Sequence, residues 1–187
     1  MTTFVIEADT SPKRTVKVFF AVWPDVAAQE RLSKLAEQLV DVCGGRKISL
    51  PLIHLTLVFI GNVESQQLET LRQVANQVKQ FSFDLTVDEI QYWRHNRIVH
   101  VGPSQCPAGL SVLVADLQNR LSQAGFSLEK RRYIPHITLI RKALCNTLPN
   151  LTIPITWHVN EWALVQSKQT DEGIVYVSLD RWPLEKV

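Results

Sequence analysis

Cysteine is scarce in this sequence, which has three in 187 residues, at positions 43, 106 and 145. No two of them form a C-x-x-C pair, so the chain carries neither a zinc-ribbon motif nor a thiol redox motif. Their number is odd and their spacings are long. We therefore expect reduced thiols, as is usual for cytoplasmic proteins.

Long apolar runs are also missing, and no stretch approaches the ~20 residues that a membrane-spanning helix needs. The first residues, MTTFVIEADTSPKR, contain two acids and no apolar core, unlike a secretory signal peptide. We expect residues 1–14 to be a flexible leader and residues 15–187 to form a single domain of two lobes. These features predict a soluble, cytoplasmic protein with no membrane partner.

Charge of one sign is not in excess, because 20 Lys and Arg stand against 18 Asp and Glu. Such a balance does not by itself indicate a nucleic-acid-binding protein. One stretch is locally basic, with no acid between its cations: Lys130, Arg131, Arg132, Arg141 and Lys142. This cluster fits a solvated basic face as well as it fits a site for a phosphate-bearing ligand.

Apolar periodicity predicts more strands than helices. Strands are expected over residues 15–23, 54–60, 81–93, 97–103, 133–140, 157–168 and 173–182, and helices over 25–43, 64–80 and 108–124. In the first helix the expected apolar stripe is Val26, Leu32, Leu35, Leu39 and Val42. The strands arrive in hairpin-like pairs without steady β-α-β alternation, which disfavours a doubly wound parallel sheet. We expect an α+β fold with antiparallel sheets and helices outside.

Two segments share the pattern H-x-T-L, one beginning at His54 and one at His136. Because side chains alternate along a strand, each His and Thr share one face and the apolar residues share the other. A single copy would fit a hydrogen-bonded histidine on a half-buried sheet. Two matched copies favour two imidazoles that face one cavity, one acting as base and one as acid. No carboxylate or cysteine recurs beside either motif, so neither a metal nor another cofactor is expected.

The paired motifs resemble the signature of the 2H phosphoesterases, a superfamily named for two H-x-[ST]-hydrophobic motifs. Within it the chain is similar, over about residues 15–183, to the RNA 2′,3′-cyclic phosphodiesterases, also called 2′-5′ RNA ligases. KVFFAVWP (17–24), IHLTLVFIGNV (53–63) and RRYIPHITLIRK (131–142) carry the resemblance, although the first begins with Lys where the family usually has Arg. The resemblance implies a bilobal, pseudo-twofold fold in which two antiparallel sheets form a central groove.

The same resemblance implies metal-independent hydrolysis of a terminal RNA 2′,3′-cyclic phosphate to a 2′-phosphomonoester, with weak reverse 2′-5′ ligation in some members. It makes His54 the proton donor, His136 the proton acceptor, and Thr56 and Thr138 phosphate contacts. Arg141 falls where the family often has a phosphate-binding arginine. Strict alternation nevertheless places it on the face opposite His136, unless the strand ends or bulges near residue 140 or the long side chain wraps around the strand.

Aromatic residues near the motifs are candidates for contact with a nucleobase, namely Phe19 and Tyr133. Phe59 is instead expected in the core, and His100 is expected to be an ordinary strand residue. Two alternatives stay open: a phosphodiesterase for a small cyclic nucleotide such as ADP-ribose 1″,2″-cyclic phosphate, and an RNA-binding module without turnover. The expected partners are RNA ends or small cyclic nucleotides, and the expected state is a monomer.

Overall fold

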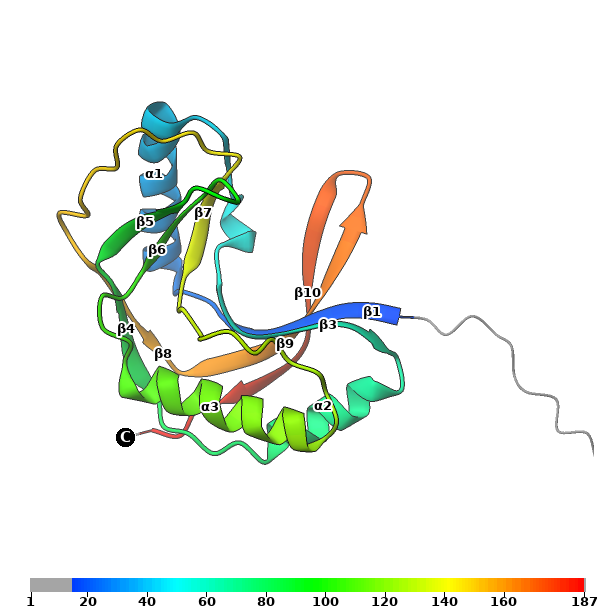
Figure 1. The fold of residues 1–187 in the computed structure, drawn as a ribbon. Helices are drawn as coiled ribbons and strands as arrows, with labels where there is room; N and C mark the ends of the chain where they lie inside the picture. The colour runs from blue at the N-terminus through cyan, green and yellow to red at the C-terminus, as the bar shows by residue number, and fades with distance from the viewer. Residues whose placement is uncertain (1–14, 187) are drawn as a thin grey trace, which may run out of the picture.

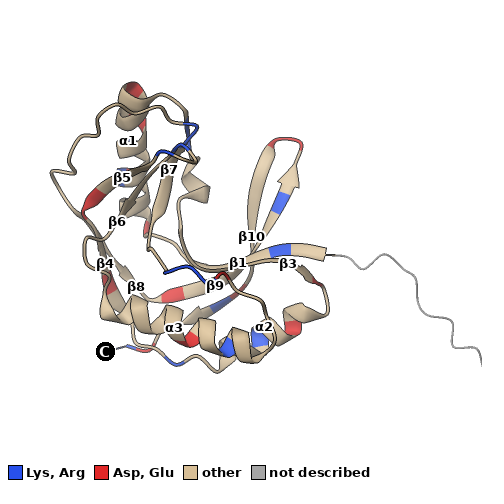
Figure 2. Cartoon of the chain, viewed as in Figure 1, with Lys and Arg blue, Asp and Glu red and all other residues tan. Residues whose placement is uncertain are grey.

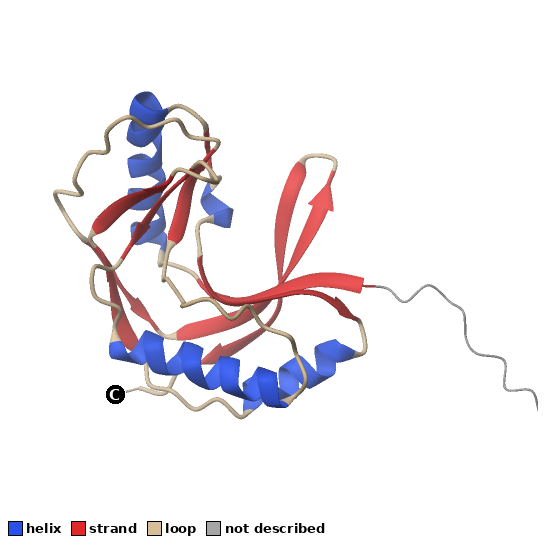
Figure 3. Cartoon of the chain, viewed as in Figure 1, coloured by secondary structure: helices blue, strands red, loops and turns tan. Residues whose placement is uncertain are grey.

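The computed structural model describes residues 15–186, so the expected leader over 1–14 lies outside the described residues. Within these residues, ten strands form two four-stranded sheets and one two-stranded sheet, and every pairing between these strands is antiparallel. The α-helices lie on the outside of the strands (Figures 1 and 3). The predicted α+β fold with antiparallel sheets and external helices is confirmed.

The first sheet has the strand order β10-β9-β1-β3. Its strands are β1 (Thr15–Val22), β3 (Leu55–Glu64), β9 (Glu161–Thr170) and β10 (Gly173–Pro183). Helices α2 (Gln67–Asn76) and α3 (Ala108–Gln123) pack against each other and against β3. The far ends of β9 and β10, which belong to this sheet, form a hairpin that rises above β1 and β3 in the view of Figure 1.

The second sheet has the order β2-β7-β6-β5, and helix α1 (Val26–Cys43) packs on β7. Its strands are β2 (Arg46–Lys47), β5 (Glu89–Trp93), β6 (Ile98–Gly102) and β7 (Ile137–Arg141). A separate ribbon pairs β4 (Phe83–Val87) with β8 (Ile155–Val159), and a short 3-10 turn, η1 (Leu50–Leu52), precedes β3. One hydrophobic cluster includes buried residues from both sheets, so the two lobes share a core.

Helix α1 begins where the sequence predicts, because the Asp25 carboxylate accepts a hydrogen bond from the backbone N–H of Ala28 at 2.8 Å. Its buried face differs from the predicted stripe and consists of Ala28, Leu32, Ala36, Leu39 and Cys43. Val26 and Val42 are 72% and 56% exposed, so their assignment to the apolar stripe was wrong. Ala28, Leu32 and Ala36 lie at i, i+4 and i+8 on the buried face, which turns both valines toward solvent.

Two predicted strands are each split in the structure. Residues 81–93 form β4 and β5, with the break at Asp88, and residues 157–168 contribute to β8 and β9, with the break at Asn160. At the first break the Asp88 carboxylate accepts hydrogen bonds from both N and Oγ of Ser104, at 2.6 Å each. These bonds hold Asp88 against the segment that follows β6. The breaks let the chain leave one sheet, form the β4–β8 ribbon and enter the other sheet.

The predicted helix over 64–80 is shorter in the structure, where α2 spans Gln67–Asn76. Strand β3 continues past residue 60, the predicted end of the strand, because its last residues pair with the start of β1. Gly61, at φ +90°, accommodates the irregular part of this pairing.

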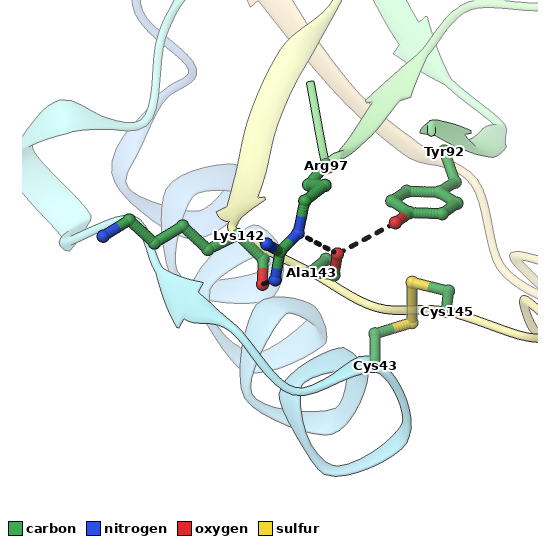
Figure 4. The surroundings of a disulfide bond; sticks show 6 residues. All are labelled: Cys43, Tyr92, Arg97, Lys142, Ala143 and Cys145. Carbon is green, nitrogen blue, oxygen red and sulfur yellow. Dashed lines mark hydrogen bonds between the residues drawn. A yellow bond between two sulfur atoms is a disulfide. The ribbon is translucent and has the colours of Figure 1, made fainter. Parts of the chain in front are cut away.

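Cys43 and Cys145 form a disulfide, so the prediction of reduced thiols was wrong for this pair. The two residues are 102 apart in sequence, and only the fold brings their Cα atoms to 4.4 Å. The bond joins the end of α1 to the segment after β7 (Figure 4). Beside it, Tyr92 Oη and Arg97 Nε both donate to the carbonyl oxygen of Ala143, at 2.8 and 3.4 Å.

We expect the Cys145→Ser variant to lose about 2–5 kcal/mol of unfolding free energy, because a crosslink that closes a long loop restricts the unfolded chain. Urea denaturation with and without dithiothreitol measures the effect. The reductant should destabilise the parent and the Cys106→Ser control, whose substituted thiol is exposed and free, but leave Cys145→Ser unchanged. A parent that is insensitive to dithiothreitol would contradict this crosslink.

Candidate active site

The two motif histidines lie in equivalent places, each directly before the first residue of a strand, β3 or β7. His54 Nδ1–H donates to the carbonyl oxygen of Leu52 at 2.7 Å, and His136 Nδ1–H donates to that of Ile134 at 2.8 Å. Each bond reaches back two residues and fixes the ring orientation. When the rings are neutral, Nε2 is therefore the unprotonated nitrogen in both.

The threonines lie on the same side as the histidines, as alternation predicts. The Thr56 hydroxyl is 3.1 Å from His54 Nε2. The apolar partners of the motifs are buried on the opposite side and are 0–1% exposed: Leu55, Leu57, Ile137 and Leu139. The sequence therefore correctly separates a core face from a groove face in both strands.

Both histidines and both threonines line one cavity of about 640 Å³, which we call chamber 1. Its other lining residues include Lys17 on β1, Arg46 and Lys47 on β2, Arg141 on β7, and Tyr176 and Glu172 near the tip of the β9–β10 hairpin. Lys47 is paired with Glu37. Among described residues, Glu172 is the one acidic side chain that lines chamber 1. The excess of cationic over acidic side chains in the lining favours an anionic ligand.

Two β-bulges determine which side chain follows each threonine into the groove. Opposite β1, Ala21 pairs with Thr56 and Phe20 with Val58, so Leu57 is an extra residue in β3. Opposite β6, His100 pairs with Thr138 and Val99 with Ile140, so Leu139 is an extra residue in β7. A bulge places two successive side chains on the same face and reverses the alternation beyond it.

The bulge in β7 places Arg141 on the groove side with Thr138, which removes the conflict with strict alternation. The bulge in β3 has the same effect on Phe59, which is 53% exposed and lines the groove. The prediction that Phe59 lies in the core was wrong, because it assumed unbroken alternation. The sequence offers no signal for either bulge, since both depend on the partner strand.

Aromatic rings pack against the imidazole of His54. The ring centroid of His54 lies 5.2 Å from Phe19 and 5.0 Å from Tyr176. Phe19 is only 3% exposed but is among the residues that line chamber 1, so its predicted contact with a nucleobase stays a prediction. Tyr133 is half-buried, and its hydroxyl donates to the backbone carbonyl of Thr56 at 3.0 Å, which ties the two motifs together.

Electrostatics favour the neutral form of both catalytic candidates in the free protein. Burial is the main cause that lowers the pKa of His54 to about 4. Burial also lowers the pKa of His136, and the charges of Arg131 and Arg141 act in the same direction. Since desolvation penalises the charged imidazolium, an anion bound between the rings would raise both pKa values again.

His100 is a neighbour of the site that the sequence did not single out. It is 1% exposed, and neither ring nitrogen has a hydrogen-bond partner within residues 15–186. Its ring centroid lies 4.1 Å from that of Trp93 and 5.4 Å from that of His136. Only the pairing of β6 with β7 places it there, opposite Thr138.

We expect His100 to make the protein acid-labile. Burial, and less strongly the nearby His136, lowers its pKa to about 4. Below its usual pKa the unfolded chain therefore binds a proton that the folded chain excludes, and stability falls as the pH falls. Between pH 7 and pH 5, His100→Leu should lose about 2 kcal/mol less unfolding free energy than the parent. Urea denaturation at both pH values measures this, and equal losses would contradict it.

The basic cluster of the sequence is only partly at the site. Arg141 lines chamber 1. A second cavity beside it, which we call chamber 2, has a volume of about 390 Å³, and its lining includes Arg131, Arg132 and Arg141. Lys130 and Lys142 line neither cavity. Figure 2 marks basic residues on β1, on the segment before β7 and at the end of β7, around the opening between the lobes. The cluster therefore combines groove residues with solvent-facing ones.

Within residues 15–186, no three His, Cys, Asp or Glu side chains gather as a metal-binding group. None of the helices in this part of the chain is long and apolar enough to cross a membrane.

Comparisons with known proteins agree on one family. A family model described as the 2′-5′ RNA ligase superfamily matches residues 24–171. The RNA 2′,3′-cyclic phosphodiesterase of Escherichia coli is 30% identical over 169 residues, which are 90% of this chain and 96% of that protein. The protein of the same name from Thermotoga maritima is 30% identical over 132 residues, 67% of this chain and 70% of that one.

A solved structure extends the likeness to the fold. The crystal structure of E. coli LigT complexed with 3′-AMP superposes with a TM-score of 0.85 at 29% identity, covering 91% of this chain and 99% of that chain.

Proposed function

The chain belongs to the 2′-5′ RNA ligase superfamily, and from this premise we propose that it hydrolyses RNA ends that carry a 2′,3′-cyclic phosphate. The product is a 2′-phosphomonoester with a free 3′-hydroxyl. The observation that carries the proposal is the convergence of two histidines, two threonines and Arg141 on one chamber. The names of the relatives support the same reaction class.

The proposed reaction needs one proton removed and one supplied. A water molecule attacks phosphorus in line with the departing 3′ oxygen, and His136 Nε2 takes the proton of the water. The P–O3′ bond breaks, and the protonated Nε2 of His54 gives its proton to the 3′ oxygen. The backbone carbonyls of Leu52 and Ile134 keep both rings in the orientation that this transfer requires.

Charge on the non-bridging oxygens of the phosphate must be stabilised during the attack. Thr56 and Thr138 can each donate a hydroxyl hydrogen bond, and Arg141 supplies a positive charge and up to two parallel donors. All three side chains line chamber 1 on the same side as the histidines. Phe59, Tyr176 and the less exposed Phe19 all line chamber 1 and can offer ring surface to the terminal base.

The pH dependence follows from the lowered pKa values. Because the limbs of kcat/KM report the free enzyme, and burial lowers the pKa of both His54 and His136, the kcat/KM optimum should lie below pH 6.5. The bound phosphate raises both pKa values, so the kcat optimum should lie at higher pH than that of kcat/KM. Steady-state rates from pH 4 to 9 measure both profiles. A kcat/KM optimum above pH 7.5 would contradict the neutral free-state histidines.

An RNA oligonucleotide ending in a 2′,3′-cyclic phosphate, incubated with the protein and EDTA, tests the function. We expect an RNA with a 2′-phosphate, identified by chromatography against 2′- and 3′-phosphate standards. Turnover of ADP-ribose 1″,2″-cyclic phosphate but not of the RNA would favour the small-nucleotide alternative. Binding without turnover of either substrate would favour an RNA-binding module. The monomeric state and the cytoplasmic location remain predictions.

A further inference from the structure

Tyr133 connects the two lobes between the catalytic motifs. Its hydroxyl donates to the backbone carbonyl of Thr56 at 3.0 Å, and the two residues are 77 apart in sequence. Thr56 lies on β3 of the first sheet, whereas Tyr133 lies in the segment that leads into β7 of the second sheet. Strand β3 is at the edge of its sheet, where a side chain from the other lobe can reach its backbone. The bond therefore joins one motif to the other.

The bonds that orient each histidine do not fix the spacing between the two. His54 Nδ1–H donates to the carbonyl of Leu52, and His136 Nδ1–H donates to that of Ile134. Each of these bonds spans two residues, so it sets a ring relative to its own strand. In the proposed reaction both rings act on one phosphorus in a single displacement, and such a step is sensitive to the relative position of the reacting groups. A bond between the motifs is what holds this relative position.

The segment that joins Tyr133 to His136 is stiff. Pro135 has a fixed φ and biases the residue before it toward extended conformations. The carbonyl of Ile134 accepts the bond from His136. On β6, Gly102 lies so close to this segment that a Cβ atom there would be 2.7 Å from the carbonyl oxygen of Pro135. A shift of Tyr133 is therefore passed on to His136.

On the other lobe, the acceptor of the Tyr133 bond is the threonine that contacts His54. The Thr56 hydroxyl is 3.1 Å from Nε2 of His54, the nitrogen that carries the proton in the proposed reaction. The Tyr133 side chain is half-buried and packs against the core, and burial raises the pKa of its hydroxyl. The hydroxyl therefore keeps its proton, and with it the bond to Thr56, over the pH range in which the histidines titrate.

Resting on the proposed function, we propose that Tyr133 is a positioning residue that holds the two catalytic histidines at the spacing that the displacement at phosphorus requires. It acts through Thr56 on His54 and through its own segment on His136, without touching the substrate. This role depends on the hydroxyl. The predicted contact between Tyr133 and a nucleobase depends instead on the ring, which lines chamber 2. Substitution can therefore separate the two roles.

Tyr133→Phe removes the hydroxyl and keeps the ring, whereas Tyr133→Leu removes both. The matched control is Tyr92→Phe. The Tyr92 hydroxyl also donates to a backbone carbonyl, that of Ala143 at 2.8 Å, but Tyr92 lies on β5 and lines neither chamber. Both phenylalanine variants should lower the midpoint of urea denaturation by a similar amount, because each loses one bond of the same kind.

Hydrolysis of an RNA that ends in a 2′,3′-cyclic phosphate should distinguish these variants. Since a misplacement of ~1 Å can cost about 10²-fold in rate, the looser spacing in Tyr133→Phe should lower kcat about tenfold and change KM by no more than about threefold. Tyr92→Phe should keep the parental kcat.

The histidine rings report on the same bond without any turnover. In protein with ¹⁵N-labelled histidine, Tyr133→Phe should shift the NMR signals of the His54 and His136 rings but not those of His158, which lies on β8. Tyr92→Phe should leave the signals of His54 and His136 unchanged.

Either an unchanged His54 signal or a parental kcat in Tyr133→Phe would overturn the positioning role. A parental Tyr133→Phe beside a Tyr133→Leu with raised KM would assign the ring to a base contact instead. Equal losses of kcat in Tyr133→Phe and Tyr92→Phe would reduce the effect to one of general stability. Absence of hydrolysis in the parent would refute the proposed function, and the NMR signals would still decide whether Tyr133 couples the two histidines.

Discussion

Replacing either His54 or His136 by alanine is expected to lower kcat for 2′,3′-cyclic phosphate hydrolysis by about 10²–10⁴-fold, the usual contribution of a positioned general acid or base. Each histidine has a separate proton to move, so both variants should be severely impaired. Because the two transfers belong to one displacement, the double variant should lose less than the product of the two single losses. Single-turnover rates measure the chemical step directly.

A control must separate lost chemistry from lost structure. His158 suits this purpose, because it lies on β8, lines neither chamber and bonds to Asp84 on the neighbouring strand. His158→Ala should retain the parent rate. The conservative variants His54→Asn and His136→Asn keep a short polar side chain that can still bond to the preceding carbonyl, and they should fold but remain inactive. A rate within tenfold of the parent in either alanine variant would remove that histidine from the mechanism.

Replacing Arg141 by alanine is expected to lower kcat/KM by about 10²–10³-fold, comparable to the loss of one preorganised donor to a developing anion. The expectation depends on the bulge at Leu139, which places this side chain beside Thr138. Arg141→Lys should recover part of the loss, since it restores the charge but not the planar pair of donors. If the contact strengthens in the transition state, kcat falls together with kcat/KM.

The matched control is the adjacent Lys142, which carries the same charge but lines neither chamber. Lys142→Ala should change kcat/KM by no more than about twofold, as is typical of surface positions. Equal losses in Lys142→Ala and Arg141→Ala would indicate a general electrostatic effect of the basic segment. A near-normal rate in Arg141→Ala would show that the phosphate is held by the threonines without it.

The equivalent bulges also give the groove its polarity. Phe59 follows Thr56 on β3 at the same spacing at which Arg141 follows Thr138 on β7. Both side chains line chambers 1 and 2. An aromatic ring thus stands on one side of the pseudo-twofold centre and a cation on the other. A substrate with a base at one end and a phosphate at the other has a preferred orientation in such a groove.

The sequence by itself determined the features that depend on neighbouring residues. The period of two in each H-x-T-L segment placed His and Thr on one face and buried Leu55 and Leu139 on the other. The start of α1 was equally local, because an Asp25 side chain caps its own helix. The doubled motif also led to the family, since two matched copies in one chain are far more specific than one.

Other features were decided only by the tertiary structure, because they depend on partners distant in sequence. The bulges arise from the registers of β1 and β6, and they moved Phe59 out of the core and Arg141 into the groove. Pairing of β6 with β7 placed His100 beneath His136. The closing of one lobe joined Cys43 to Cys145 across 102 residues. The alternation of side chains is encoded in the sequence of each strand. Strand register, burial and the disulfide depend on which distant segment packs against that strand or helix in the folded chain.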